Sequence, residues 1–198
     1  TDRFVSGGGA APGDRLLLTK GAGIEATAIL ATDFREACAE AGVSAATLDA
    51  AAGFLGDVSV VPDAAAVRDA ASAMHDPTEG GLLTALVETA SASGAVLEVE
   101  RDRVPVRPET RTCCDALGVD PLATFGSGAL LAAVPPERVD EATDALAAAG
   151  VDVGEIGEVR EAEGRDDRDR DAASPGTVLL DGERIAEPPR DELYPLWE

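Results

Sequence analysis

The sequence predicts an α/β domain of the α+β type, in which helices flank one mixed β-sheet. Apolar runs of strand length alternate with segments of helical spacing along the 198 residues. Near the end of the chain, two short apolar runs surround Asp181-Gly182, a dipeptide typical of β-hairpin turns. No repeat of fixed period interrupts this order. We therefore expect a single domain over residues 1–198.

Glycine, proline and N-cap residues mark the element boundaries in the first half of the chain. Ser44 is suited to cap a helix, and Pro62 followed by Asp63 is suited to open the next one. The expected elements are a glycine-rich entry loop at 1–13, a strand at 14–19, a glycine turn at 20–23, and helices at 24–41, 44–54 and 62–73.

The second half is predicted to alternate helices with strands. The expected elements are helices at 78–92, 107–117 and 135–149, strands at 95–100, 129–134 and 151–159, and a hairpin at 177–185. Residues 160–175 alternate Asp and Arg without an apolar face, which is typical of a solvated loop. Residues 186–198 form a tail, and we expect it to dock on the body through Leu193, Tyr194, Leu196 and Trp197.

The charge of the chain excludes several classes of partner. It carries 38 acidic and 16 basic residues, a net charge of −22. This excess opposes binding to a nucleic acid backbone. No apolar run approaches the roughly 20 residues that span a bilayer, and no basic-then-apolar export signal opens the sequence. We expect no nucleic acid or membrane partner and a cytoplasmic location.

The cysteines indicate a reducing compartment. Cys38, Cys113 and Cys114 are odd in number and lack CxxC spacing. Cys113 or Cys114 could be a reactive thiol, but the sequence holds no second histidine to serve as a partner base. A structural role is therefore favoured.

Residues 74–82, MHDPTEGGL, gather the only histidine of the chain, two carboxylates, a hydroxyl and two glycines where a helix is expected to begin. Asp76 is predicted as the N-cap, Pro77 as the first helical residue, and Glu79 as the partner of Asp76 in a capping box. The same pattern also marks an ordinary helix start, and a solitary histidine is often only a packed or exposed side chain. A purely structural role is the alternative.

The predicted helix start is also a predicted anion site. The N–H groups of residues 78–81 would be free there, and the helix dipole would favour a phosphate or carboxylate. Gly80 and Gly81 each cost about 0.5–1 kcal/mol relative to alanine in a helix. Close approach of a ligand or of another backbone segment would explain them.

Two nucleotide-binding folds are disfavoured by the glycine pattern. Gly21-x-Gly23 lacks the third glycine of the dinucleotide-binding fingerprint, and the chain contains no GK[ST] phosphate loop.

Several motifs in fixed order resemble the C-terminal domain of the aminoimidazole ribonucleotide (AIR) synthase superfamily. They are PGD at 12–14, KGAGIE at 20–25, HDPTEGGL at 75–82 and SGALL at 127–131. The resemblance runs from about residue 6 to residue 159. It is greatest to the branch of the hydrogenase expression/formation (maturation) factors and AIR synthase-related proteins.

This resemblance implies an α/β domain beside an N-terminal domain that binds most of the ATP and forms a dimer. It implies ATP-dependent activation of an oxygen, or phosphorylation of an acceptor, with ATP and Mg²⁺ as cofactors of the complete enzyme. We expect the N-terminal ATP-binding domain to be absent from this chain and the isolated domain to be inactive. A homo-oligomer and a small phosphorylated or carboxylated substrate are also expected.

The resemblance also implies roles for individual residues. His75 would donate a proton or orient the substrate, and Asp76 would cap the helix or contact a metal. The predicted catalytic residues are thus His75 and Asp76, and the predicted substrate- or phosphate-binding residues are Thr78, Glu79, Gly80, Gly81, Lys20, Gly21, Gly23, Ser127 and Gly128. For Lys20 the alternative is a solvated lysine. For Ser127 and Gly128 it is close packing of small residues.

One departure from the family limits the expected chemistry. The maturation factors carry an acceptor cysteine at the extreme C-terminus, whereas this sequence ends in YPLWE. We therefore expect a more distant member of the superfamily. A non-catalytic assembly or regulatory domain that retains the fold is the second hypothesis, and the sequence upstream of Thr1 would discriminate between the two.

We predict that the fold requires salt. Lys20 is the only lysine, and the acidic excess is typical of proteins adapted to high salt, where screening weakens self-repulsion. Circular dichroism should show loss of structure, or a lower melting temperature, when the salt concentration falls from molar to millimolar. An unchanged spectrum and melting temperature would contradict this adaptation.

Overall fold

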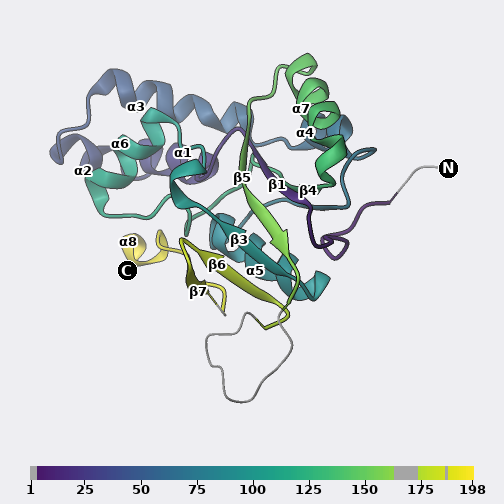
Figure 1. Cartoon of the computed structure of the whole chain (residues 1–198). Helices are drawn as coiled ribbons and strands as arrows, with labels where there is room; N and C mark the ends of the chain where they lie inside the picture. Colours follow the sequence, from purple (N-terminus) through teal and green to yellow (C-terminus); the bar gives the residue numbers. More distant parts are fainter. Residues whose placement is uncertain (1–3, 163–173, 186) are drawn as a thin grey trace.

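In the part of the chain that the structure describes, seven strands form one sheet in the order β2-β4-β1-β5-β3-β6-β7 (Figure 1). The computed structural model describes residues 4–162, 174–185 and 187–198. The strands are β1 Arg15–Thr19, β2 Ala73–His75, β3 Val96–Val99, β4 Leu131–Val134, β5 Val153–Arg160, β6 Thr177–Leu180 and β7 Glu183–Ile185. β3 and β6 run parallel, whereas the other neighbouring described strands are antiparallel. The predicted mixed sheet is confirmed.

Two groups of helices cover the sheet, and a third group lies beside it (Figure 1). α5 packs on one face, α4 and α7 on the other, and α1, α2, α3 and α6 form a separate cluster. The helices are α1 Ile24–Thr32, α2 Arg35–Glu40, α3 Ala45–Ala52, α4 Val61–Val67, α5 Gly81–Ser93, α6 Pro108–Leu117, α7 Val139–Ala148 and α8 Tyr194–Trp197, with 3₁₀ turns η1 Gly53–Asp57, η2 Arg101–Arg103 and η3 Pro136–Arg138.

The three central residues of β1 are leucines because both faces of the strand are buried there. Leu16 and Leu18 point to the α5 side, and Leu17 between them points to the α4 and α7 side. The other half of the sheet is covered on one face only. Glu98 in β3 and Glu158 in β5 therefore face water between buried neighbours.

Capping and turn residues account for most of the confirmed boundaries. The Ser44 side chain accepts the Thr47 N–H and begins α3. Pro108 opens α6, and Gly94 ends α5 in a left-handed conformation with φ of 62°. Asp181 and Gly182 both have positive φ, as a type I′ hairpin turn requires.

The single helix predicted over residues 24–41 is wrong, since the chain forms α1 and α2 with a break at Asp33 and Phe34. The break directs the Phe34 ring toward Trp197, with 5.1 Å between the ring centroids. Packing of the C-terminal tail thus overrides the local helical pattern.

The helix predicted over residues 62–73 is also too long, because α4 ends at Val67 and residues 73–75 form β2. β2 pairs with β4, and the Met74 N–H also donates to the Ser6 carbonyl on its outer side. A three-residue strand is too short to show the period-two alternation that identifies strands. His75 therefore lies at the end of a strand.

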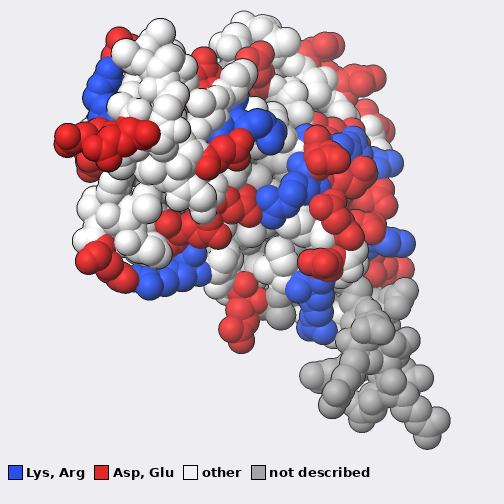
Figure 2. All heavy atoms as spheres, turned by 90° about the vertical axis from the view of Figure 1, so that its left-hand side faces the viewer, with Lys and Arg blue, Asp and Glu red and all other residues white. Residues whose placement is uncertain are grey.

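The tail docks as predicted. Leu193 is fully buried, and the Tyr194 ring meets Phe125 edge to face at 5.7 Å. Most of the solvated loop predicted at 160–175 lies outside the described residues. Figure 2 shows acidic side chains spread over the side of the molecule that carries α2 and α3, with basic side chains among them.

Among the described residues, no single helix has the length and hydropathy of a membrane span. One bent pair, Ala45–Asp57 with Val61–Val67, passes by length and composition alone.

Candidate functional site

Three of the four sequence motifs, at 20–25, 75–82 and 127–131, lie at the same end of the sheet, whereas the motif at 12–14 precedes β1 at the other end. β1 and β2 each run antiparallel to β4, and Leu131 at the start of β4 pairs with both Leu18 and His75. The segment after β1, the segment after β2 and the segment before β4 therefore start within about two strand spacings, roughly 10 Å, of one another. This end of the sheet is the candidate site.

The loop between β2 and α5, residues 76–80, is not helical, which corrects the predicted helix start. α5 begins at Gly81 after a left-handed Gly80, so Asp76 is not its N-cap and Pro77 is not its first residue. Glu79 consequently forms no capping box. The Thr78 carbonyl accepts the N–H groups of Gly81 and Gly126, and these bonds hold the loop outside the helix.

Gly80 and Gly81 are required by the packing of the chain on itself. Their φ angles are 71° and 61°. A Cβ on Gly81 would lie 2.3 Å from the Thr124 carbonyl oxygen, and one on Gly80 would lie 2.2 Å from Thr84 Oγ1. Of the two reasons predicted for these glycines, close approach of another backbone segment is the one observed at Gly81.

A carboxylate of the protein itself, that of Asp191, occupies the anion position predicted at the start of α5. Asp191 in the C-terminal tail is 2% exposed. Its Oδ2 accepts the Gly80 N–H at 2.8 Å, and its Oδ1 accepts from the Thr124 hydroxyl at 3.2 Å and the Leu193 N–H at 3.0 Å. The prediction of free N–H groups over residues 78–81 is therefore wrong for Gly80 and Gly81. Within the described residues, the amides of Thr78 and Glu79 have no such bond.

His75 pairs with a carboxylate that the sequence did not indicate. Its Nε2 lies 2.7 Å from Glu88 Oε2, on the second turn of α5, and its Nδ1 lies 3.2 Å from the Asp76 carbonyl oxygen. Both of these oxygens are acceptors, so the ring forms both hydrogen bonds only when both nitrogens carry protons. The contact with Glu88 is then an ion pair.

A groove of about 360 Å³ runs beside this pair, between α5 and the tail. It is lined by His75, Thr78, Glu79, Gly80, Thr84, Ala85, Glu88 and the tail residues Pro188, Pro189, Arg190 and Asp191. Thr84 Oγ1 is buried and has no hydrogen-bond partner within the described residues. A hydrogen bond to Glu79 raises the pKa of Tyr194 on the neighbouring tail.

Lys20 lies in a different, buried cluster. Its ammonium donates to the carbonyl oxygens of Asp57, Ser59 and Gly128 and lies 3.1 Å from Asp63 Oδ2. The side chain is 11% exposed, so the solvated alternative is wrong.

The glycines predicted around Lys20 also pack on the chain itself. A Cβ on Gly21 would lie 2.8 Å from the Pro105 carbonyl oxygen, one on Gly23 would lie 3.1 Å from that of Pro121, and one on Gly128 would lie 2.9 Å from Ile24. Ser127 is half-buried beside them.

The sequence-predicted residues therefore divide between two places at one end of the sheet. His75, Thr78, Glu79 and Gly80 line the groove, whereas Lys20 and Gly128 share the buried cluster. Glu88 and Asp191 were missed. A helical periodicity counted from Gly81 would have placed Glu88 on the same face as Thr84, but Asp191 is 111 residues from Gly80 and carries no local signal.

The three cysteines lie away from the groove. All are buried in the cluster formed by α1, α2, α3 and α6. Burial raises the pKa of Cys113 to about 11 and that of Cys114 to about 12. They are therefore protonated, packed thiols, as the sequence favoured.

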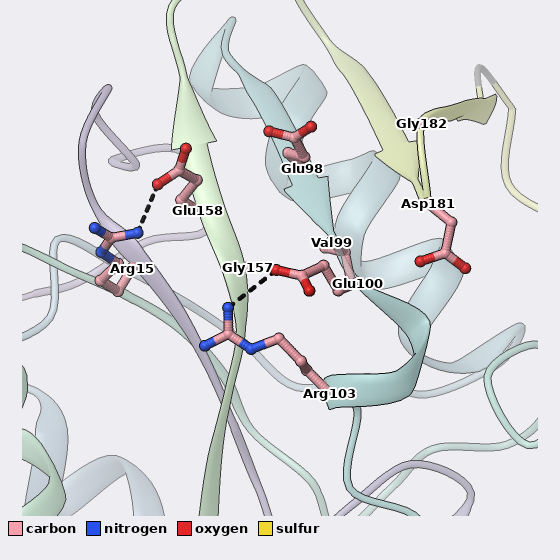
Figure 3. A pocket seen from close by; sticks show the side chains of 9 residues that line it. All are labelled: Arg15, Glu98, Val99, Glu100, Arg103, Gly157, Glu158, Asp181 and Gly182. Carbon is pink, nitrogen blue, oxygen red and sulfur yellow. Dashed lines mark hydrogen bonds and ion pairs between the residues drawn. The ribbon is translucent and has the colours of Figure 1, made fainter.

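A second hollow of about 400 Å³ lies on the open face of the sheet. In Figure 3, Arg15 from β1 points toward Glu158 of β5, and Arg103 points toward Glu100. Glu98 pairs with Arg160 at 2.8 Å. Five of the six charged side chains that line this hollow are thus in ion pairs, and Asp181 accepts the Arg101 N–H, as expected for a solvated antiparallel face.

Within the described ranges, no group of three or more His, Cys, Asp or Glu side chains is placed to hold a metal ion. The described residues therefore do not gather the carboxylates that a multi-ligand magnesium site would use.

Comparison with known proteins identifies the fold. A family model described as AIR synthase related protein, C-terminal domain, matches residues 11–167. Carbamoyl dehydratase HypE of Azotobacter vinelandii is 31% identical over 92% of this chain and 46% of that protein. The hydrogenase expression/formation protein HupE of Azotobacter chroococcum is 32% identical over 72% of this chain and 40% of that protein. The chain thus spans less than half the length of these relatives.

Solved structures agree with these relatives. HypE of E. coli superposes with a TM-score of 0.73 at 26% identity, covering 98% of this chain and 56% of that one. A HypE solved in complex with ATP has a TM-score of 0.64 at 26% identity, covering 91% and 52%. Thiamine monophosphate kinase of Aquifex aeolicus has a TM-score of 0.68 at 22% identity, covering 93% and 56%, a likeness in fold alone.

We predict that Asp191 stabilises the start of α5. Asp191→Asn removes the charge and leaves the Gly80 N–H facing a weaker acceptor, which should lower the free energy of unfolding by about 1–3 kcal/mol. Urea denaturation measures this, and exchange of the Gly80 amide with deuterium should accelerate. Glu187→Gln removes the same charge from an exposed tail position and should have little effect. Equal effects of the two changes would show that Asp191 acts only through net charge.

We also predict that alkaline pH destabilises the fold through the buried thiols. The unfolded chain loses thiol protons near the ordinary pKa of 9.0, whereas the folded chain retains them until about 11 or 12. The folded state then binds more protons, so the free energy of unfolding should fall by up to about 1.4 kcal/mol per thiol for each pH unit between 9 and 11. Urea unfolding at pH 8 and pH 10 measures this fall. A Cys114→Ala variant with the same pH dependence as the parent would contradict it.

Proposed function

The chain belongs to the AIR synthase-related protein family, and we propose that it is the substrate-side domain of an ATP-dependent enzyme. The observation that carries the proposal is the 31% identity to a carbamoyl dehydratase HypE over 92% of the chain. In this proposal, an N-terminal ATP-binding domain completes the active site. That domain also brings the magnesium ion, since the described residues offer no cluster for it.

The position of the groove supports a shared active site. The loops after β1 and β2 and the loop before β4 meet at one end of the sheet, and the groove opens beside them. A second domain that covers this end would enclose the groove and exclude water. Enclosure matters because ATP-dependent group transfer depends largely on positioning and charge neutralisation.

The proposed chemistry of this half is proton transfer and orientation at an oxygen of the substrate. His75 is 22% exposed along its side chain, so a bound molecule in the groove can reach its ring. In its protonated form Nε2 exchanges its Glu88 partner for the substrate oxygen and donates a proton to it, while the Nδ1 hydrogen bond to the Asp76 carbonyl keeps the ring oriented. The Thr78 hydroxyl and the amides of Thr78 and Glu79 are available to bind a phosphate or carboxylate. Asp76 is exposed beside them.

The cysteines argue against an acceptor thiol within this chain. Cys38, Cys113 and Cys114 are each fully buried, and none lines the groove. Because the thiolate is the nucleophilic form, raised thiol pKa values weaken this role further. The acceptor in our proposal is therefore an oxygen of a separate small molecule, and its identity is to be found by assay.

A non-catalytic assembly or regulatory role is the second candidate, and one observation favours it. Asp191 already occupies the anion position at the start of α5. A domain whose anion site is filled by its own tail needs no substrate there to be complete. In that case the groove would bind no substrate, and the complete gene product would not turn over nucleotide.

The two candidates predict different activities. The 198-residue chain alone should show negligible ATP turnover, whereas the complete gene product should release phosphate or ADP. In the complete protein, His75→Gln should lower kcat by roughly 10²–10⁴-fold, as loss of a general acid does. Glu88→Gln should cause a smaller loss. Coupled assays of ADP and phosphate release give these values.

Glu141→Gln is the matched control, since Glu141 is also a helical carboxylate paired with a cation, Arg138, but lies on α7. It should leave turnover unchanged. Wild-type activity in the His75 variant, or turnover by the isolated chain that a mutation within it abolishes, would overturn the proposed division of labour. Absence of ATP turnover in the complete protein would favour the non-catalytic role.

A further inference from the structure

The Lys20 ammonium is surrounded by four oxygen atoms contributed by distant parts of the chain. The distances from Nζ are 2.7 Å to the Gly128 carbonyl, 2.8 Å to that of Ser59, 3.0 Å to that of Asp57 and 3.1 Å to Asp63 Oδ2. An ammonium has three protons, and the three carbonyls take them. Asp63 Oδ2 forms no hydrogen bond within the described residues and serves as the counter-charge.

The fold builds this oxygen cage with strain and close packing. Lys20 has φ of 57°, a left-handed conformation that is unusual for a residue other than glycine. Gly128 has φ of 108°, and a Cβ on it would lie 3.0 Å from the Asp57 carbonyl oxygen. Asp63 is fully buried, and its Oδ1 accepts the Thr19 hydroxyl at 2.5 Å. The cage is therefore a preformed arrangement of backbone and carboxylate oxygens.

The residue that fills the cage is the only lysine in a chain that otherwise uses arginine. A compact ammonium presents its charge to oxygens in all directions, whereas a guanidinium is planar and donates in a fixed fork. Three carbonyls and one carboxylate around a point charge also match the way that proteins bind K⁺, through carbonyl oxygens that replace its hydration shell. The four oxygens therefore suit a compact cation better than the planar guanidinium of an arginine.

We propose that this cage is a monovalent-cation site, for an ion of the size of K⁺ or NH₄⁺, which the chain fills permanently with the Lys20 ammonium. The tethered cation joins the end of β1, the 57–59 segment and the loop before β4. These segments adjoin the candidate site, so Lys20 is a positioning residue for that end of the sheet. The inference does not depend on the proposed enzymatic function.

The test is cation rescue of a variant without the lysine side chain. Lys20→Gly suits the left-handed backbone and leaves the cage empty. In NaCl or tetramethylammonium chloride its melting temperature should be lower than that of the parent by roughly 6–20 °C, since it leaves the buried Asp63 carboxylate without its counter-charge. In KCl or NH₄Cl at the same concentration the melting temperature should recover and rise with the logarithm of the salt concentration. The parent chain should respond alike to all four salts.

Two further variants separate a cation site from general stabilisation. Lys20→Met fills the space without charge and should not respond to K⁺. Lys20→Gly combined with Asp63→Asn removes the counter-charge, so the difference between KCl and NaCl should disappear. Crystals of Lys20→Gly grown with RbCl should show an anomalous peak surrounded by the four cage oxygens.

Several outcomes would overturn the proposal. These are equal melting temperatures of Lys20→Gly in the four chlorides, failure of this variant to fold even in KCl, and a Rb⁺ peak outside the cage. Rescue by ammonium but not by K⁺ would also contradict it, because the cage would then require a hydrogen-bond donor and a positive charge alone would not suffice.

Discussion

The buried carboxylate of Asp191 is the contact on which the candidate site depends. It lies at the start of α5, where it accepts the Gly80 N–H and the Thr124 hydroxyl. Through these bonds the tail, the loop between β2 and α5 and the loop before β4 are fixed to one another. A helix start attracts an anion whether that anion is a ligand or a side chain. Here the chain supplies its own, and the groove is left with the His75 ring, the Thr78 hydroxyl and two amides.

Lys20 binds backbone groups of the opposite kind at the end of β1, two strands away from β2 in the sheet. Asp191 satisfies backbone N–H groups with a negative charge, whereas Lys20 satisfies backbone carbonyls with a positive one. Both charges are nearly or fully buried and hydrogen-bonded, which limits the cost of removing them from water. Together they order loops that carry little apolar surface. One end of the sheet in this acidic chain is thus held by two internal charges of opposite sign, each hydrogen-bonded to backbone groups.

The sequence predicted best where local chemistry and tertiary packing agree. The three leucines of β1 and all four residues of β4 are apolar because both faces of these strands are buried, and Asp181-Gly182 turns the hairpin as its conformational preference requires. The start of α5 was mispredicted because the N–H groups of Gly81 and Gly126 donate to the Thr78 carbonyl and override the Asp-Pro signal. The position of Glu88 on the helix face is counted from that start, so its contact with His75 was not predicted either. Asp191 could not be found, since its partner is 111 residues away. The family came from the order of the motifs rather than from any one of them, whereas the fold class already followed from the alternation of strand-length and helical apolar patterns.

We propose that this domain meets the nucleotide, and the domain that binds it, at the end of the sheet where the 76–80 loop and the loop before β4 lie. Hydrogen–deuterium exchange of the complete gene product, with and without Mg²⁺ and the ATP analogue AMPPCP, tests this proposal. Exchange should be slower in peptides covering residues 76–81 and 122–129 and unchanged in the hairpin at 177–185. Protection confined to that hairpin and to the open face of the sheet, with no change at the two loops, would contradict it.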